Sequence, residues 1–185
     1  MEIATTDVRS LQARLEAIEA REQITQVLYR YCRGWDRRDE DIIRSCFWPE
    51  ARHQHGAFDG LSMDFVAFGL TLTAKVKGVR HAISNVMIEL SGDRAISECY
   101  FTAIHRRPTP DGASEEDRFL EGRYIDRLER RDGEWRIIHR VGLNDFEQVQ
   151  PRSDVGLASL PPEARSRRKP DDRLYAMLAE FREGR

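Results

Sequence analysis

Apolar residues in the first part of the chain recur at steps of three and four positions. The series consists of Leu11, Leu15, Ile18, Ile24, Val27, Leu28 and Tyr31. This spacing is typical of an amphipathic helix. We expect a short leading helix, begun near Asp7 or Ser10, that runs into a second helix over about residues 20–36. Apolar positions resume at residues 42–47, and Pro49 is expected to close this helical region.

A short strand and a further helix are predicted next. Residues 51–58 have the pattern of a strand that ends at Asp59-Gly60, a pair typical of turns. Residues 61–76 have a helical pattern with Phe65 and Phe68 on one side, and Gly78 is a typical helix stop.

From residue 79 to about residue 149 the pattern predicts antiparallel sheet. Four segments, 79–90, 95–106, 119–130 and 134–146, are rich in β-branched and aromatic residues. Asp132-Gly133 is a strong hairpin signal, and residues 108–116 are polar enough for a long exposed loop. Helices followed by long strands predict an α+β domain over residues 1–150. It would be a cone in which a curved antiparallel sheet wraps around the N-terminal helices and leaves a pocket at its open end.

Residues 151–185 form a C-terminal extension beyond this domain. Its first part, as far as Pro170, carries Pro, Ser and Arg and is predicted to be irregular. Leu174, Leu178 and Phe181 then share one face of an amphipathic stretch. We expect a helix there that packs on the domain or on a neighbouring subunit.

Composition limits the possible partners. A net charge of −2 and a pI near 6.2 give no electrostatic basis for binding nucleic acid or an anionic membrane, so neither is expected. The three cysteines are too few for a disulfide framework or a zinc cluster. No signal-peptide pattern and no apolar run of membrane-spanning length is present. These features predict a cytoplasmic protein.

The end of the second predicted helix carries Tyr31, Trp35 and Asp36. Tyr31 and Trp35 lie four positions apart and share a face. Asp36 would face the negative end of the helix dipole, which is an unfavourable place for a carboxylate. It is therefore a candidate base or orienting partner. The alternative is a surface Asp that ends the helix by competing for backbone hydrogen bonds.

Polar residues also interrupt the apolar faces of the predicted strands. Alternation places His81 and Asn85 on one face with apolar neighbours, as in a mixed pocket wall, although a hydrogen-bonded core His or a solvent-facing strand would give the same pattern. His105 shares a face with Phe101 and could project into the same cavity. Arg140 lies where the last strand becomes apolar, and needs an anionic ligand or a carboxylate such as Asp126 or Glu98.

His53-Gln54-His55 could chelate a metal, because residues two apart share a strand face. A third ligand at metal-site spacing is missing, however, and no Gly-rich nucleotide loop or Gly-x-Ser-x-Gly motif occurs. We therefore expect neither a metal nor an organic cofactor.

Several of these segments together resemble a known family. They are the Tyr31–Asp36 segment, residues 78–85 (GVRHAISN), residues 122–126 (GRYID) and residues 130–137 (RRDGEWRI). Over about residues 11–149 the chain resembles the SnoaL-like branch of the nuclear-transport-factor-2-like (NTF2-like) superfamily. That branch includes scytalone dehydratase, bile-acid 7α-dehydratase and hexachlorocyclohexane dehydrochlorinase.

The resemblance implies a cofactor-independent lyase that starts an elimination by proton abstraction. By motif position, Asp36 would orient His81 as the general base. Tyr31 and Arg140 would stabilise charge on oxygen, and His105 would be a further acid–base group. Trp35, His55, Phe65, Phe68, Asn85 and Phe101 are expected to bind a hydrophobic, aromatic or polycyclic substrate. A C–C lyase, an isomerase or a cyclase could use the same pocket, and a non-catalytic ligand binder or scaffold is the alternative of another class.

A homo-oligomer is also expected. A curved sheet has an outer face that needs cover, and the late strands carry apolar residues on both faces, such as Tyr100 on one and Phe101 on the other. The resemblance favours a trimer over a dimer.

Overall fold

The computed structural model describes residues 3–154 and 156–184, with side chains from residue 7 onward. The elements run in the order α1 (Ile3–Arg37), α2 (Glu40–Ser45), β1 (Phe47–His55), β2 (Phe58–Leu61), α3 (Ser62–Leu72), β3 (Gly78–Ser91), β4 (Arg94–Pro108), β5 (Glu115–Arg131), β6 (Glu134–Pro151) and α4 (Arg173–Arg182). Two short 3₁₀ turns, Leu157–Ser159 and Pro162–Ala164, precede α4.

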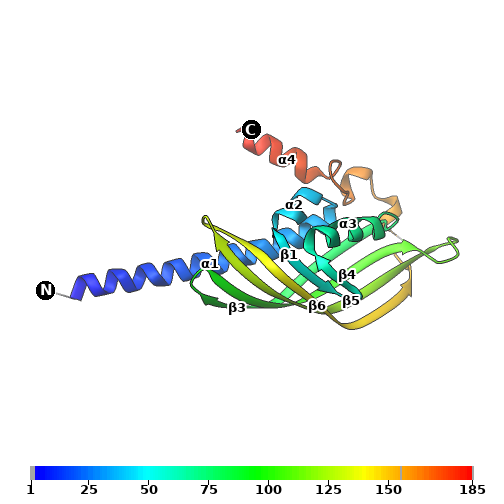
Figure 1. Cartoon of the computed structure of the whole chain (residues 1–185). Helices are drawn as coiled ribbons and strands as arrows, with labels where there is room; N and C mark the ends of the chain where they lie inside the picture. The colour runs from blue at the N-terminus through cyan, green and yellow to red at the C-terminus, as the bar shows by residue number, and fades with distance from the viewer. Residues whose placement is uncertain (1–2, 155, 185) are drawn as a thin grey trace.

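Six strands form one curved sheet in the order β2-β1-β6-β5-β4-β3. Neighbouring strands are antiparallel except β1 and β6, which are parallel. Figure 1 shows the sheet curving along α1, α2 and α3. The predicted α+β fold, with a curved sheet around N-terminal helices, is therefore confirmed.

The inner face of this sheet and the second half of α1 form the core. Along β4, Cys99, Phe101 and Ala103 are buried, whereas Tyr100 between them is 46% exposed. Ile24 and Leu28 of α1 are fully buried against this face. The alternation that predicted the strands thus also distinguishes their inner and outer faces.

One continuous helix replaces the two that were predicted. The predicted boundary near residue 20 lies inside α1. No Gly or Pro interrupts residues 3–33, so the backbone continues as a helix while its apolar face changes side.

The connections around β1 also differ from the prediction. The helical region ends at Ser45, and Pro49 lies inside β1, where the pairing with β6 is irregular between Phe47 and Arg52. Pro has no N–H to donate to the ladder, so it is tolerated where the pairing of the strands is interrupted. The turn falls at residues 56–57, where Gly56 has a φ of 58°, and Asp59-Gly60 belongs to β2.

The C-terminal extension returns to its own domain at the junction of α1 and α2 (Figure 1). Lys169 Nζ lies 2.9 Å from the carboxylate of Asp39, and the Tyr175 hydroxyl donates to the same group at 2.9 Å. α4 buries none of its residues, and Phe181 is 78% exposed. None of the described helices is long and apolar enough to cross a membrane.

Candidate active site

Asp36 and His81 are in direct contact. Asp36 Oδ1 accepts hydrogen bonds from the backbone N–H of His81 and from its Nδ1, each at 2.8 Å. The two side chains are only 15% and 10% exposed. A carboxylate on Nδ1 requires the proton to be there, which leaves Nε2 as the basic nitrogen of a neutral imidazole. The contact that the resemblance implies is therefore present.

The fold explains why these two residues meet. β3 is an edge strand, and the pairing of His81 with Ala103 leaves its N–H directed away from β4. α1 ends beside this edge, where Arg38 adopts a left-handed conformation with a φ of 53° and closes the helix. Asp36 thus satisfies an edge-strand donor and orients the imidazole at the same time.

An interior cavity of about 310 Å³ opens in front of His81. Most of its wall comes from α1, α3 and the inner sheet face. The aromatic and polar lining residues include Tyr31, Trp35, His55, Phe65, Phe68, His81, His105 and Tyr124. Trp35 packs edge-to-face on Phe65 at 6.0 Å between ring centroids. A mostly aromatic wall with a few convergent polar groups is typical of a small-molecule site.

His105 faces His81 across this cavity, with ring centroids 5.7 Å apart. Burial, with the nearby His81 as a further cause, lowers the pKa of His105 to about 4. Its Nε2 is buried and has no hydrogen-bond partner among the described residues. His105 is therefore a neutral group that can exchange a hydrogen bond with a ligand.

Tyr31 and Tyr124 form the deeper wall. Burial raises the pKa of Tyr31 to about 12, so its hydroxyl remains protonated at neutral pH. The Arg140 guanidinium lies 4.0 Å from the centroid of the Tyr31 ring and 4.3 Å from that of Tyr124. The two tyrosines thus stand beside a buried cation.

Arg140 itself is an internal structural group. It is fully buried and pairs bidentately with Asp126, with bonds of 2.7 and 2.6 Å. Although burial disfavours its charge, Asp126 raises the pKa of Arg140 above its usual value. The carboxylate partner that the sequence left open is therefore Asp126, whereas Glu98 pairs with Arg123. Arg140 lies behind the tyrosines and is not part of the cavity lining.

Two predicted substrate-binding residues do not line the cavity. Asn85 is exposed and has a φ of 51°, in a bulge between Ser84 and Met87 that breaks the strand alternation. The inference that it shares a face with His81 is therefore wrong. Phe101 is buried behind the wall, where it stacks on Tyr124 at 4.4 Å.

His53 and His55 share a strand face and stack with an interplanar angle of 4°. His53 is fully buried, its ring lies 3.6 Å from that of Phe65, and both of its ring nitrogens lack a partner within the described residues. Burial lowers the pKa of His53 to about 2 and also lowers that of His55. In the described part of the chain, no group of three His, Cys, Asp or Glu side chains could hold a metal ion.

Sequence reasoning did not single out Tyr124 or Gly69. Tyr124 lies two residues before Asp126 on the inner face of β5, and this alternation could have identified it. Gly69 brings α3 against the Trp35 ring, since a Cβ there would lie 2.4 Å from the ring. A lone Gly in a helix gives no comparable signal.

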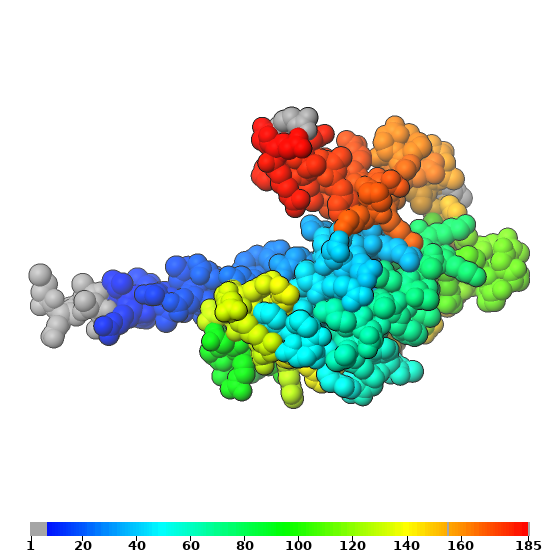
Figure 2. Space-filling view, turned by 45° about the horizontal axis from the view of Figure 1, so that its top comes forward, coloured from blue at the N-terminus to red at the C-terminus, as the bar shows by residue number. Residues whose placement is uncertain are grey.

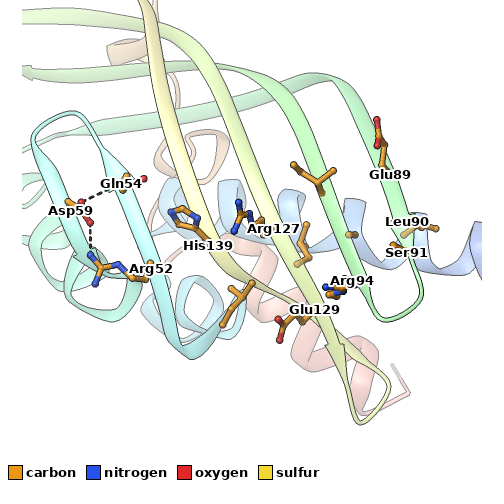
Figure 3. A pocket seen from close by; sticks show the side chains of 14 residues that line it. Arg52, Gln54, Asp59, Glu89, Leu90, Ser91, Arg94, Arg127, Glu129 and His139 are labelled. Atoms are coloured by element: carbon orange, nitrogen blue, oxygen red, sulfur yellow. Dashed lines mark hydrogen bonds and ion pairs between the residues drawn. The ribbon is translucent and has the colours of Figure 1, made fainter.

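A larger hollow of about 790 Å³ lies on the outer face of the sheet, away from the dyad. Figure 3 shows charged residues from several strands around it, including Arg52 joined to Asp59. Among the described residues that line it, none is Phe, Tyr or Trp. The interior cavity is therefore the better candidate for an active site.

Comparison with known proteins identifies the family to which these features belong. A SnoaL-like domain matches residues 16–141, and none of the curated proteins compared matches the chain. The dehydrochlorinase LinA-type3 from Novosphingobium barchaimii shares 19% identity at a TM-score of 0.64, over 80% of this chain and 99% of its own. A protein described as a scytalone dehydratase, from Novosphingobium aromaticivorans, shares 20% at 0.63, over 78% and 97%.

A protein of unknown function from Mycobacterium tuberculosis shares 19% identity at a TM-score of 0.55, over 99% of this chain and 94% of its own. Identities this low show a common fold and leave the reaction open.

Proposed function

The chain belongs to the SnoaL-like domain family, and we propose that it is a cofactor-independent lyase acting on a hydrophobic, aromatic or polycyclic small molecule. The observation that carries the proposal is the hydrogen-bonded pair of Asp36 and His81 at the wall of an aromatic cavity. Solved neighbours of the same fold include proteins named as a dehydrochlorinase and as a scytalone dehydratase.

The proposed reaction is an elimination. His81 Nε2 takes a proton from a substrate carbon, and the electron pair of that C–H bond forms a C=C bond as the leaving group departs with its own electron pair. In a dehydration the leaving hydroxide then takes the proton from His81, which gives water and restores the base. Asp36 stabilises the intermediate imidazolium and keeps it oriented.

Tyr31 and His105 would bind the substrate oxygen that gains charge. The Tyr31 hydroxyl is protonated because burial raises its pKa to about 12. His105 is neutral because burial lowers its pKa to about 4. Both can donate a hydrogen bond at neutral pH, and such fixed donors stabilise charge in a transition state. Arg140 would contribute its positive charge at a distance, across the rings of Tyr31 and Tyr124.

An isomerase is the second candidate. His105 lies 5.7 Å from His81 between ring centroids, so a second group could return a proton at another carbon. The two reactions differ in the mass of the product, because an isomerase leaves it unchanged. A panel of hydroxylated aromatic and polycyclic compounds, analysed by mass spectrometry, would separate them.

The dyad gives the sharpest test of catalysis. With a substrate from that panel, His81→Ala and Asp36→Asn should each lower kcat by about 10²–10⁴-fold, the usual range for a general base. The double variant should lose little more than the worse single one, because the residues act as a unit. Unchanged circular dichroism would show that the fold survives. Full activity in His81→Ala, or ligand binding without any turnover in the native chain, would overturn the proposal.

A further inference from the structure

The N-terminal half of α1 projects beyond the sheet. Figures 1 and 2 show it as a lone helix extending away from the rest of the molecule. Ala20 is the first of its described residues to be buried. This part of the chain plays no part in the cavity, so its surface needs a separate explanation.

This projecting segment carries an apolar stripe. Val8, Leu11, Leu15 and Ile18 are 62%, 53%, 56% and 62% exposed. Their spacing of three, four and three residues is that of the a and d positions of a coiled coil. A helix that presents such a stripe to water is missing a partner.

The stripe cannot be covered by the domain to which it belongs. Leu15 precedes the buried Ile24 by nine residues, which is about two and a half turns of a helix. The same interval separates Ile18 from the buried Val27. The stripe and the core face of α1 therefore lie on opposite sides of the helix.

Charges on either side of the stripe favour one kind of partner. With Leu15 at position a, Arg14 and Arg21 occupy g positions on one flank, and Glu19 occupies an e position on the other. In the described part of the chain, neither Arg14 nor Glu19 has an ion-pair partner. When two identical helices pair in parallel, g residues of one meet e residues of the other. Arg14 would then face Glu19 of the second copy, twice by symmetry.

Antiparallel pairing would instead place like flanks together, with the two copies of Arg14 opposed. We propose that the stripe formed by Val8, Leu11, Leu15 and Ile18 pairs in parallel with the same stripe of a second copy of this chain. The two domains then lie on opposite sides of the helix pair, because their core faces point outward. Glu22 follows Ile18 in the same spacing and is exposed, so repulsion between its two copies ends the pairing before the domains.

Mass in solution tests the pairing. Leu11→Glu combined with Leu15→Glu should halve the mass of the assembly measured by light scattering at micromolar concentration. Ala13→Glu is the matched control, since Ala13 is exposed on another side of the same helix and should leave the mass unchanged. A native chain of 21.5 kDa, or an unchanged mass in the double variant, would overturn the proposal.

A disulfide crosslink tests the direction of the helix pairing, and it does not require the Leu11→Glu/Leu15→Glu variant to fold well. Ile18→Cys should form a disulfide-linked dimer on mild oxidation, because parallel helices bring the two copies of position 18 together. In an antiparallel pair they would lie roughly 15 Å apart, given a rise of 1.5 Å per residue. The native cysteines Cys32, Cys46 and Cys99 are buried and should not contribute. Absence of the crosslink, with the thiol at position 18 still reactive, would contradict parallel pairing.

Discussion

Asp36 makes two hydrogen bonds to one residue, and together they fix the orientation of His81, the candidate base. Its Oδ1 holds both the main chain and the ring of His81, so the imidazole cannot rotate without losing a bond. Pre-organised geometry of this kind lowers the cost of reaching the transition state. The pair of Arg140 and Asp126 is a different case, since nothing outside the protein reaches it.

Removing the charge of Asp126 should therefore affect stability strongly. Asp126→Asn leaves Arg140 buried with its charge uncompensated, which costs about 3–5 kcal/mol. Urea denaturation would measure this loss. Glu98→Gln is the matched control, because it breaks the more exposed ion pair with Arg123 and should cost less than about 1 kcal/mol. Equal effects of the two changes would contradict the buried role of the Arg140–Asp126 pair.

His53 should make the fold sensitive to acid. Its pKa is about 2 in the folded chain, because burial disfavours the cation, and about 6.5 when unfolded. As pH falls from 7 to 5, the unfolded chain binds a proton at this residue and the folded chain does not. This single group should then remove about 2 kcal/mol of stability.

His53→Leu should reduce the loss of stability between pH 7 and pH 5 by about this amount, as measured by denaturation at the two pH values. A slope against pH identical to that of the native chain would show that His53 does not titrate in this way.

At the scale of elements, the contact between α3 and α1 sets the width of the cavity. Gly69 faces the Trp35 ring so closely that an added Cβ would lie 2.4 Å from it. Gly69→Ala should push Trp35 into the cavity, raise KM about tenfold, and cost about 1–3 kcal/mol as overpacking does. Ala67→Ser, at an exposed position of the same helix, is the control. An unchanged KM would show that Trp35 takes no part in substrate binding.

The sequence predicted what depends on local periodicity. The alternation of β4 placed Cys99, Phe101 and His105 on one face correctly, and the helical pattern placed Phe65 and Phe68 beside the cavity. The contact between Asp36 and His81 came only through the family resemblance, because no local pattern connects residues 45 positions apart.

What failed depends on tertiary geometry. A bulge after Ser84 removes Asn85 from the pocket face, and a bulge carries no signature in the alternation itself. The turn after β1 formed at Gly56 rather than at Asp59-Gly60, since the pairing of β1 with β2 overrides the local preference of that dipeptide. Asp126 could be identified as the partner of Arg140 only from the register of β5 against β6, which places the two residues opposite each other.

At the scale of the whole molecule, the outer face of the sheet is a second surface without cover. Tyr100 pairs with Arg123 and Arg123 with Leu143, so these side chains form one row across three strands. Met87, Ile96, Tyr100 and Leu143 are all partly exposed there, at 69%, 45%, 46% and 37%. This face lies on the opposite side of the sheet from the cavity, and it is separate from the stripe on α1.

We propose that this sheet face assembles three copies of the chain. Because the α1 stripe would add a further association, the sheet is best tested in the Leu11→Glu/Leu15→Glu variant, whose mass by light scattering should be three times 21.5 kDa. Adding Ile96→Glu and Tyr100→Glu should return it to one chain, because two carboxylates per copy would be buried without partners. If the Leu11→Glu/Leu15→Glu variant has twice the mass of one chain, the sheet face forms a dimer and not a trimer. If that variant already has the mass of one chain, the sheet face has no role in assembly.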